Sequence, residues 1–270
     1  MTQAYEKELA DHLANFTMRW TDGELRSYLS SRSRLPGPRA NLELAGAFAE
    51  AVCGQPRDWK TMWTLCTRWT AIAPKEAPTN DPLEFVVFCG VRGVGALGAG
   101  SSTRAREALS HLRGLARDPR WRVREAVAMA LQDILESHPD VALRAFRAWV
   151  APGAWLEMRA VAAGLAEPRV LRERKVARAA VEMHEDMLKR FRAAKERDSD
   201  EFRSLRQCLA YSVSVVVAAA PEEGFRWMMR LAEAKDPDVL WILKENSKKS
   251  RLADVFPGRV ERIRAIMRHG

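Results

Sequence analysis

The feature that most constrains the fold of this chain is a helical pattern that recurs, with regular breaks, through its second half. In residues 118–140, DPRWRVREAVAMALQDILESHPD, apolar side chains from Val123 to Ile134 recur at spacings of three and four residues. That spacing is typical of an amphipathic helix. Asp118 is a good N-cap and Pro119 suits the first helical position. The segment therefore predicts one helix that ends near residue 138.

Further segments follow the same scheme. DVALRAFRAWV and AWLEMRAVAAGLAEP predict two helices separated by the break APG, and two more are predicted on either side of Asp236 and Pro237. Corresponding helices near residues 104 and 140, or 120 and 153, begin 36 and 33 residues apart. Helix, tight turn and helix at such a period are typical of an α-solenoid. We therefore expect an all-α fold, a right-handed α-solenoid of helix pairs.

A loop divides the beginning of the chain. Pro36, Gly37 and Pro38 interrupt the segment SSRSRLPGPRANLE, residues 30–43, and predict a loop that serves as a hinge. We expect an N-terminal helical part over residues 1–80, joined to a repeat region over residues 81–270.

The segment EFVVFCGVRGVGALGAG, residues 84–100, contains the glycine spacing of a dinucleotide-binding loop. That loop requires a parallel strand before it and a second strand that ends in an acidic residue about twenty positions later. Asp118 lies twenty residues after Gly98, but a predicted helix precedes Asp118 and a turn follows it. The pattern therefore does not predict a nucleotide site, and we expect no cofactor.

Two unusual compositions are still predicted to be helical. We expect a helix over residues 82–99, in which Gly90, Gly93 and Ala96 let neighbouring helices approach closely. YSVSVVVAAAP, residues 211–221, is rich in β-branched residues that favour strands. Because helices are predicted on both sides of it, we expect a buried inner helix there.

The chain is strongly basic, with a formal net charge of +9. Residues 1–80 hold ten Lys and Arg against nine Asp and Glu, so a net charge of +8 lies beyond residue 80. Most of these bases fall in the segments 104–124, 169–192 and 244–268. Arginine supplies 34 of the 44 bases, and its guanidinium matches phosphate geometry. This excess favours a polyanionic partner.

Other features narrow the chemistry. The four cysteines form no C-x-x-C pair, which argues against a zinc site and a disulfide framework, so we expect reduced core cysteines and no metal. VEMHED, residues 181–186, does not have metal-binding spacing, and we expect His184 on a solvated face. The apolar runs are too short to span a bilayer and the start does not read as a secretory signal. We expect a cytoplasmic protein without a membrane partner.

The unit DPRWRVREAVAMAL, residues 118–131, resembles the second helix of a HEAT repeat, in which an Asp, a Val-Arg pair and a stripe of small residues recur. This unit and DPDVLWILKENSKKSRL, residues 236–252, also resemble repeats of the AlkD/AlkC-like DNA alkylation repair superfamily. The resemblance covers roughly residues 82–256. It implies a solenoid of HEAT-like helix pairs that holds duplex DNA against a basic concave face, and some members excise N-alkylated purines.

The catalytic residue of the superfamily's glycosylases has no counterpart here. Those members are similar in a Trp-rich helix that presents a catalytic Asp, whereas RDWKTMWTLCTRWTA, residues 57–71, has three Trp but no acid after them. Asp58 precedes this helix in the manner of a cap. Base loss creates oxocarbenium character that a carboxylate must stabilise. The catalytic residue is therefore unknown, with Glu84, Glu125 and Glu157 as carboxylates that only coordinates can place.

One group of candidate nucleic-acid-binding residues lies at the predicted helix N-terminus after Asp118. Trp121, Arg122 and Arg124 are placed there, where backbone N–H groups and guanidinium groups suit a phosphate. Arg124 alternatively pairs with Asp118, as the corresponding Arg does in HEAT units.

The second group lies near the C-terminus. Lys244 and Lys248 are four residues apart and share a helix face, with Trp241 three residues before Lys244 and Lys249 directly after. Bases beside an aromatic side chain suit a nucleic acid, although bases at a helix C-terminus are also favoured by the helix dipole. Arg159 completes the set of candidates.

Three functions remain open from the sequence. The favoured one is sequence-independent binding of duplex or damaged DNA, including alkylated DNA, through a basic concave face. The alternatives are a protein–protein interaction scaffold and an N-alkylpurine DNA glycosylase. DNA binding predicts that Arg122, Arg159, Lys244 and Lys248 project from one face.

Overall fold

The computed structural model describes residues 2–55 and 58–269, and this part of the chain consists of α-helices joined by loops, with no β-strand. The prediction of an all-α fold is confirmed. The chain divides into two compact units, Met1–Ala142 and Leu143–Gly270. Within each unit the helices pack mainly on helices close to them in sequence, as stacked helix pairs do.

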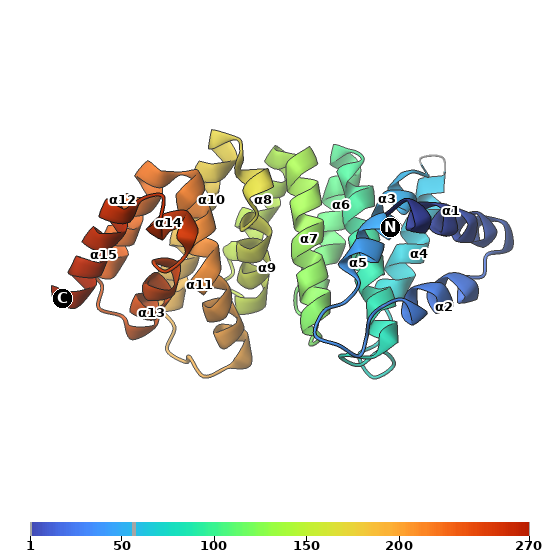
Figure 1. The fold of residues 1–270 in the computed structure, drawn as a ribbon, viewed down its shortest axis with the longest axis horizontal. Helices are drawn as coiled ribbons and strands as arrows, with labels where there is room; N and C mark the ends of the chain where they lie inside the picture. Colours follow the sequence, from blue (N-terminus) through green and yellow to red (C-terminus); the bar gives the residue numbers. More distant parts are fainter. Residues whose placement is uncertain (1, 56–57, 270) are drawn as a thin grey trace. The chain divides into compact units, whose positions relative to one another are not determined.

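The first unit is built around one central helix, α5, which contacts α2, α3, α4, α6 and α7 (Figure 1). Because α3 and α4 pack directly on α5, the chain on both sides of residue 80 shares one core. The helices of this unit are α1 (Thr2–Arg19), α2 (Gly23–Ser31), α3 (Leu42–Cys53), α4 (Trp59–Thr70), α5 (Pro82–Ala99), α6 (Ser102–Leu115) and α7 (Trp121–Ser137), and α8 (Pro139–Val150) contains the division at residue 142.

The glycine-rich segment forms α5, with the bounds that the sequence predicted. Asp81 caps this helix by accepting a hydrogen bond from the Leu83 amide. Close approach of neighbouring helices is confirmed at two of the three predicted positions, because a Cβ at either Gly90 or Gly93 would collide with Cys66. The third position, Ala96, is half-buried and its role stays a prediction, whereas Gly95 packs closely against Ala130 of α7.

Among the described residues, α5 is also the one helix that is long and apolar enough to cross a membrane by length and composition. However, 72% of it is buried inside the protein. Its contacts with five neighbouring helices account for its apolar composition, so α5 is a core helix.

The second unit is built around α11 in the same way. This helix contacts α9, α10, α12, α13, α14 and the short 3-10 helix η2 (Figure 1). The β-branched stretch from residue 211 lies inside α11, which confirms that it forms a buried helix. The elements of this unit are α9 (Trp155–Leu165), η2 (Pro168–Leu171), α10 (Arg174–Arg192), α11 (Asp200–Ala219), α12 (Pro221–Ala232), α13 (Pro237–Asn246), α14 (Ser250–Ala253) and α15 (Pro257–His269).

The predicted start of α7 was wrong by two residues. The helix begins at Trp121 with Arg120 as its N-cap, rather than at Pro119 with Asp118 as its cap. The reason is local, since the Asp118 carboxylate accepts hydrogen bonds from the Arg120 amide and from the Arg120 side chain. The two helices predicted on either side of Asp236 and Pro237 are confirmed as α12 and α13, and there Asp236 does cap the second helix while Pro237 opens it.

The predicted loop between α2 and α3 is confirmed. Its far end is fixed by Asn41, whose side chain caps α3 by accepting a hydrogen bond from the Leu44 amide. Its middle is held by the Gly37 carbonyl, which accepts a hydrogen bond from Arg122 at 2.6 Å. The proposed role as a hinge stays a prediction.

The solvated face predicted around His184 was wrong for the histidine itself, which is 0% exposed. Nδ1 donates to the Ala180 carbonyl at 2.8 Å, which leaves Nε2 to accept a hydrogen bond from the Ser212 hydroxyl at 3.0 Å. Burial lowers the pKa of His184 to about 4, although the bond to Ala180 opposes this shift. The histidine is therefore a neutral core residue that links α10 to α11.

The cysteines lie largely where they were expected. Cys66, Cys89 and Cys208 are buried, and none of the three is part of a disulfide. Cys53 is also free but exposed, so it is not the core residue that was predicted.

Candidate polyanion-binding site

Nearly all of the excess positive charge belongs to the second unit. Residues 1–142 hold 18 Lys and Arg against 17 Asp and Glu, whereas residues 143–270 hold 26 against 18. The first unit is therefore nearly neutral at +1 and the second carries +8. A polyanion would be attracted mainly to the second unit.

The arginines at the start of α7 are directed inward. Arg122 is 3% exposed, and its guanidinium bonds to the buried Glu84 carboxylate at 3.2 Å as well as to the Gly37 carbonyl. Arg120 is 2% exposed and bonds to both carboxylate oxygens of Asp118. These buried pairs join α7 to α5 and to the preceding turn. Neither guanidinium presents a free fork to a phosphate in this structure.

The other two predicted residues of this group are more accessible. Arg124 is half-buried and donates to the carbonyls of Asp118 and Pro119 at 2.7 and 2.9 Å, so it closes the turn before α7. Trp121 is 44% exposed, and the Arg122 guanidinium carbon lies 4.3 Å from its ring centre. In the second unit, the predicted Arg159 is buried on α9 at 8% exposure.

A cavity of about 630 Å³ lies in the second unit between α13 and α15. Every charged side chain that lines it is cationic, and these side chains are Lys244, Lys248, Arg264 and Arg268. Its apolar wall is formed by Leu240, Trp241 and Met267. A site of this kind attracts a negatively charged group and also offers an aromatic surface.

The cavity also contains an unsatisfied polar group. Ser247 lines it and is 1% exposed, yet its hydroxyl oxygen has no hydrogen-bond partner in the structure. The backbone carbonyl of the same residue accepts a hydrogen bond from Arg264 at 2.9 Å. A buried hydroxyl without a partner costs free energy unless a ligand or water satisfies it.

Two carboxylates at the edge of the cavity restrain its cations. Lys248 pairs with Glu245 at 2.5 Å, and this hydrogen bond lowers the pKa of Glu245. Glu261 pairs with Arg268 at 2.5 Å and with Arg264 at 3.8 Å. With both acids counted, the four lining cations leave a net charge of about +2 at the site.

Trp241 is held in place from α11. The Arg206 guanidinium stacks on the indole, with its central carbon 3.8 Å from the ring centre, while Nε lies 2.7 Å from a carboxylate oxygen of Asp238. Cation–π stacking of this kind contributes about 0.5–2 kcal/mol. Arg206 covers one face of the indole and does not itself line the cavity, whereas Trp241 does.

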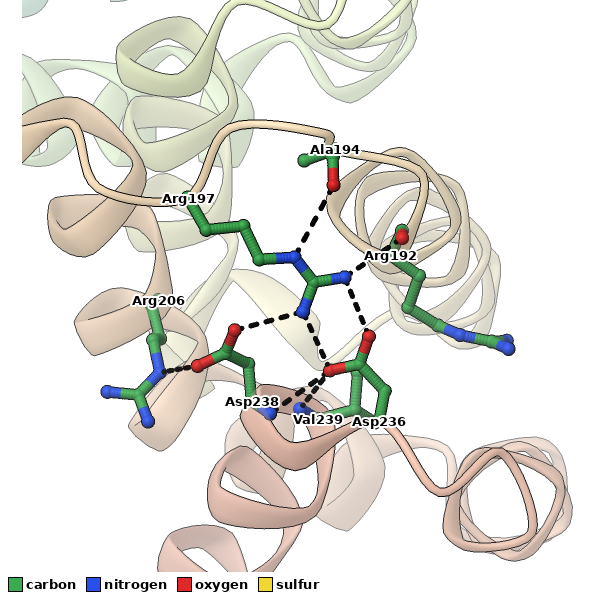
Figure 2. A network of polar contacts seen from close by, with 7 residues as sticks. All are labelled: Arg192, Ala194, Arg197, Arg206, Asp236, Asp238 and Val239. Atoms are coloured by element: carbon green, nitrogen blue, oxygen red, sulfur yellow. Dashed lines mark hydrogen bonds and ion pairs between the residues drawn. The ribbon is translucent and has the colours of Figure 1, made fainter.

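Arg206 is in turn part of a network at the start of α13 (Figure 2). Arg197 lies between two acids, bonding to Asp236 at 2.7 and 3.0 Å and to Asp238 at 3.0 Å. It also donates to the carbonyls of Arg192 and Ala194 at the end of α10. Three segments are thereby fixed relative to one another: the loop after α10, the first turns of α11, and α13.

The central ion pair of this network, Arg197 with Asp236, stays ionised near neutral pH. Hydrogen bonding to Asp236 raises the pKa of Arg197 above its ordinary value. Burial alone would raise the pKa of Asp236, but hydrogen bonds from Arg197 and from the Val239 amide lower it.

The sequence anticipated part of this cavity. Trp241, Lys244 and Lys248 line it together, whereas Lys249 is half-buried and lies outside its lining. Arg264 and Arg268 were missed as individual residues, although they lie within the basic segment 244–268. Their spacing of four residues, which places both on one face of α15, was the available signal.

The carboxylates considered for catalysis are engaged in the fold. Glu84 is 0% exposed beneath Arg122, and Glu157 is 2% exposed on α9. Beside the Trp-rich helix α4, the carboxylate of Asp22 accepts a hydrogen bond from the Trp69 indole at 2.5 Å and pairs with Arg68 at 2.9 Å. Among the described residues, no group of three or more His, Cys, Asp or Glu side chains is arranged to hold a metal ion.

The chain matches no protein-family model and no curated protein sequence. One solved structure, described as the crystal structure of an engineered protein, is 14% identical to this chain with a TM-score of 0.38. The match covers 96% of this chain and 97% of that one. A likeness this weak carries no argument about either fold or function.

Proposed function

We propose that this protein binds DNA without sequence preference through the phosphate-attracting surface of its second unit. The observation that carries the proposal is the cavity between α13 and α15, whose charged lining is entirely cationic, in the unit that holds +8 of the net charge of +9. The segment 236–252, which supplies most of this lining, is also one of the two that resemble repeats of DNA alkylation repair proteins. The cytoplasm stays the proposed location.

Phosphate contact explains these residues better than base readout does. Lysine and arginine side chains position a protein on the DNA backbone but carry no sequence information by themselves. Reading bases in the major groove requires side chains that project from a helix or a two-stranded ribbon into the groove, whereas these cations line a recess between two helices. We therefore propose an affinity that depends strongly on salt and weakly on sequence.

A salt-titrated binding assay tests the proposal. If the four lining cations each neutralise one phosphate of a fluorescent duplex, the logarithm of the affinity falls with the logarithm of salt at a slope of about −3.6. Removing two cations with Lys244→Ala and Lys248→Ala makes the slope shallower by about 1.8. Intact and alkylated duplexes are compared in parallel to measure any preference for damage.

The matched control removes the same charge from the first unit. Lys60 and Lys75 are exposed, and the double change to Ala there is expected to leave the slope unchanged. A wild-type slope near zero would contradict DNA binding. Equal losses of DNA affinity in the two double variants would show that the net charge of the protein, and not the cavity, determines binding.

A further inference from the structure

We propose that the cavity between α13 and α15 receives one unpaired nucleotide of a DNA strand, with the base against Trp241 and the phosphate among the surrounding cations. This inference rests on the proposed function and specifies its substrate. It predicts that DNA with an unpaired nucleotide binds more tightly than a fully paired duplex.

The apolar wall is the reason to look beyond phosphate contacts. In a paired duplex the bases are stacked inside the helix, so backbone binding uses cations and leaves an apolar recess empty. Here Leu240, Trp241 and Met267 line the same cavity as the cations. An unpaired nucleotide has both a flat apolar base and a phosphate, and base–aromatic stacking tolerates any base because every base has a π-face.

The size and the polar groups of the cavity agree with such a ligand. Its volume of about 630 Å³ falls within the range of about 300–1,000 Å³ that is typical of small-molecule sites. Ser247, which lines the cavity, has a buried hydroxyl without a partner, and a base or sugar atom is the partner that the inference assigns to it. A surface for phosphate alone needs neither the recess nor this hydroxyl.

The surrounding structure holds the stacking surface in a defined position. Arg206 covers one side of the Trp241 indole, and Asp238 fixes Arg206 in turn. Arg197 anchors Asp238 from the loop after α10 (Figure 2). A ring that is positioned before binding loses little conformational freedom when a base stacks on it.

The test compares a blunt DNA hairpin with the same hairpin carrying a two-nucleotide overhang, by fluorescence anisotropy at one salt concentration. The wild-type protein is expected to bind the overhang about tenfold more tightly, which is a typical effect of one stacked base. Trp241→Ala is expected to abolish this preference, so that the variant binds the two hairpins with equal affinity. Trp241→Leu, which keeps apolar packing, is expected to do the same, so that unfolding cannot explain the loss.

Trp121→Ala is the matched control, because Trp121 is an exposed tryptophan that also lies beside a guanidinium but is in the first unit. It is expected to keep the full preference for the overhang. Equal wild-type affinity for the two hairpins would overturn the inference and leave DNA binding intact, whereas failure to bind the blunt hairpin would overturn the proposed function itself. A preference that survives both Trp241 variants would also overturn the inference.

Free ligands identify the source of the nucleotide. Deoxyadenosine monophosphate is expected to displace the overhang hairpin only at concentrations at least about a hundredfold above the hairpin's dissociation constant, since it lacks the neighbouring phosphates. Inorganic phosphate is expected to compete more weakly still. Equal competition by the two would exclude a contribution from the base, and micromolar binding of the free nucleotide would assign the cavity to mononucleotides instead of a strand.

Discussion

At the scale of single residues, Glu261 opposes the proposed function because its carboxylate forms ion pairs with two cations of the cavity, Arg264 and Arg268. A phosphate has to displace it. Glu261→Gln removes the competing charge and is expected to tighten duplex binding about 1.4- to fivefold, since an exposed ion pair contributes about 0.2–1 kcal/mol. Anisotropy titrations at low salt measure this change.

A second glutamate provides the control for that prediction. Glu222 forms a comparable exposed pair with Arg259 on the same unit, but neither residue lines the cavity between α13 and α15. Glu222→Gln changes the net charge by the same amount and is expected to raise the affinity much less. If both variants gain the same DNA affinity, the net charge of the second unit explains the effect and the cavity does not.

His184 predicts a pH dependence of stability. In the folded state burial holds its pKa at about 4, whereas the ordinary value is 6.5, so the unfolded chain takes up the proton first as the pH falls. The contribution of the neutral histidine to the free energy of unfolding is complete above pH 6.5. It is lost progressively as the pH falls toward 4, and the loss reaches at most about 3 kcal/mol.

The measurement for His184 is the free energy of unfolding from denaturant titrations between these pH values. His184→Gln cannot titrate, so its stability is expected to fall less steeply with acid than that of the wild type. At neutral pH the variant is expected to be about 1–3 kcal/mol less stable, because it loses buried hydrogen bonds to Ala180 and Ser212. Parallel pH profiles would show that other groups account for the acid sensitivity.

Single residues were predictable where the relevant neighbours are close in sequence. Trp241, Lys244 and Lys248 share one helix, so their spacing placed them together. Arg206 comes from α11 and contacts Trp241 only through the tertiary fold, which no local pattern reveals. The pairing of Arg122 with Glu84 spans 38 positions, and for this reason an arginine expected at the surface is buried.

At the scale of helices, two glycines make opposite predictions. A Cβ on Gly95 of α5 would lie 2.5 Å from the Ala130 Cβ of α7, so Gly95→Ala is expected to force the helices apart and cost about 1–3 kcal/mol. Gly46 of α3 has no atom within 4 Å of the equivalent position. Gly46→Ala is therefore expected to stabilise the protein by about 0.5–1 kcal/mol.

Thermal and denaturant unfolding of the two glycine variants measure both effects. The sign of the difference is informative because both substitutions add one methyl group to a helix. Destabilisation by both would show that helix propensity does not control the Gly46 position. Stabilisation by both would contradict the close packing of α5 on α7.

The helices themselves were predictable because the apolar spacing and the capping residues agreed. Asp81 and Pro82 opened α5, and the helical segments on both sides of residues 211–221 outweighed a local preference for strands. The start of α7 could not be predicted from propensity alone. Asp118 is a good cap in principle, but its carboxylate bonds more favourably with the guanidinium of Arg120.

At the scale of the whole chain, the buried ion pairs do not reduce the net charge. Arg122 with Glu84, and Arg120 with Asp118, are each neutral, so the excess of positive charge remains available outside the cores. The division at residue 142 assigns that excess to the second unit, whereas counting along the sequence placed it only beyond residue 80. The Asp and Glu residues between residues 80 and 142 balance the charge of the arginines in segment 104–124.

This distribution predicts where DNA protects the protein from amine acetylation. Three of the ten lysines lie in the first unit and seven in the second, so peptide mass mapping reports on both units. Lys244 and Lys248 are exposed in the free protein and are expected to lose most of their reactivity when duplex DNA is bound at low salt. Lys60 and Lys75 are also exposed and have the same reactive amine. Because the unit that contains them has a net charge of only +1, their reactivity is expected to stay unchanged when DNA is bound. Uniform protection of all four would mean that the phosphate backbone follows the whole chain, and protection of the first unit alone would contradict the assignment of binding to the charge excess.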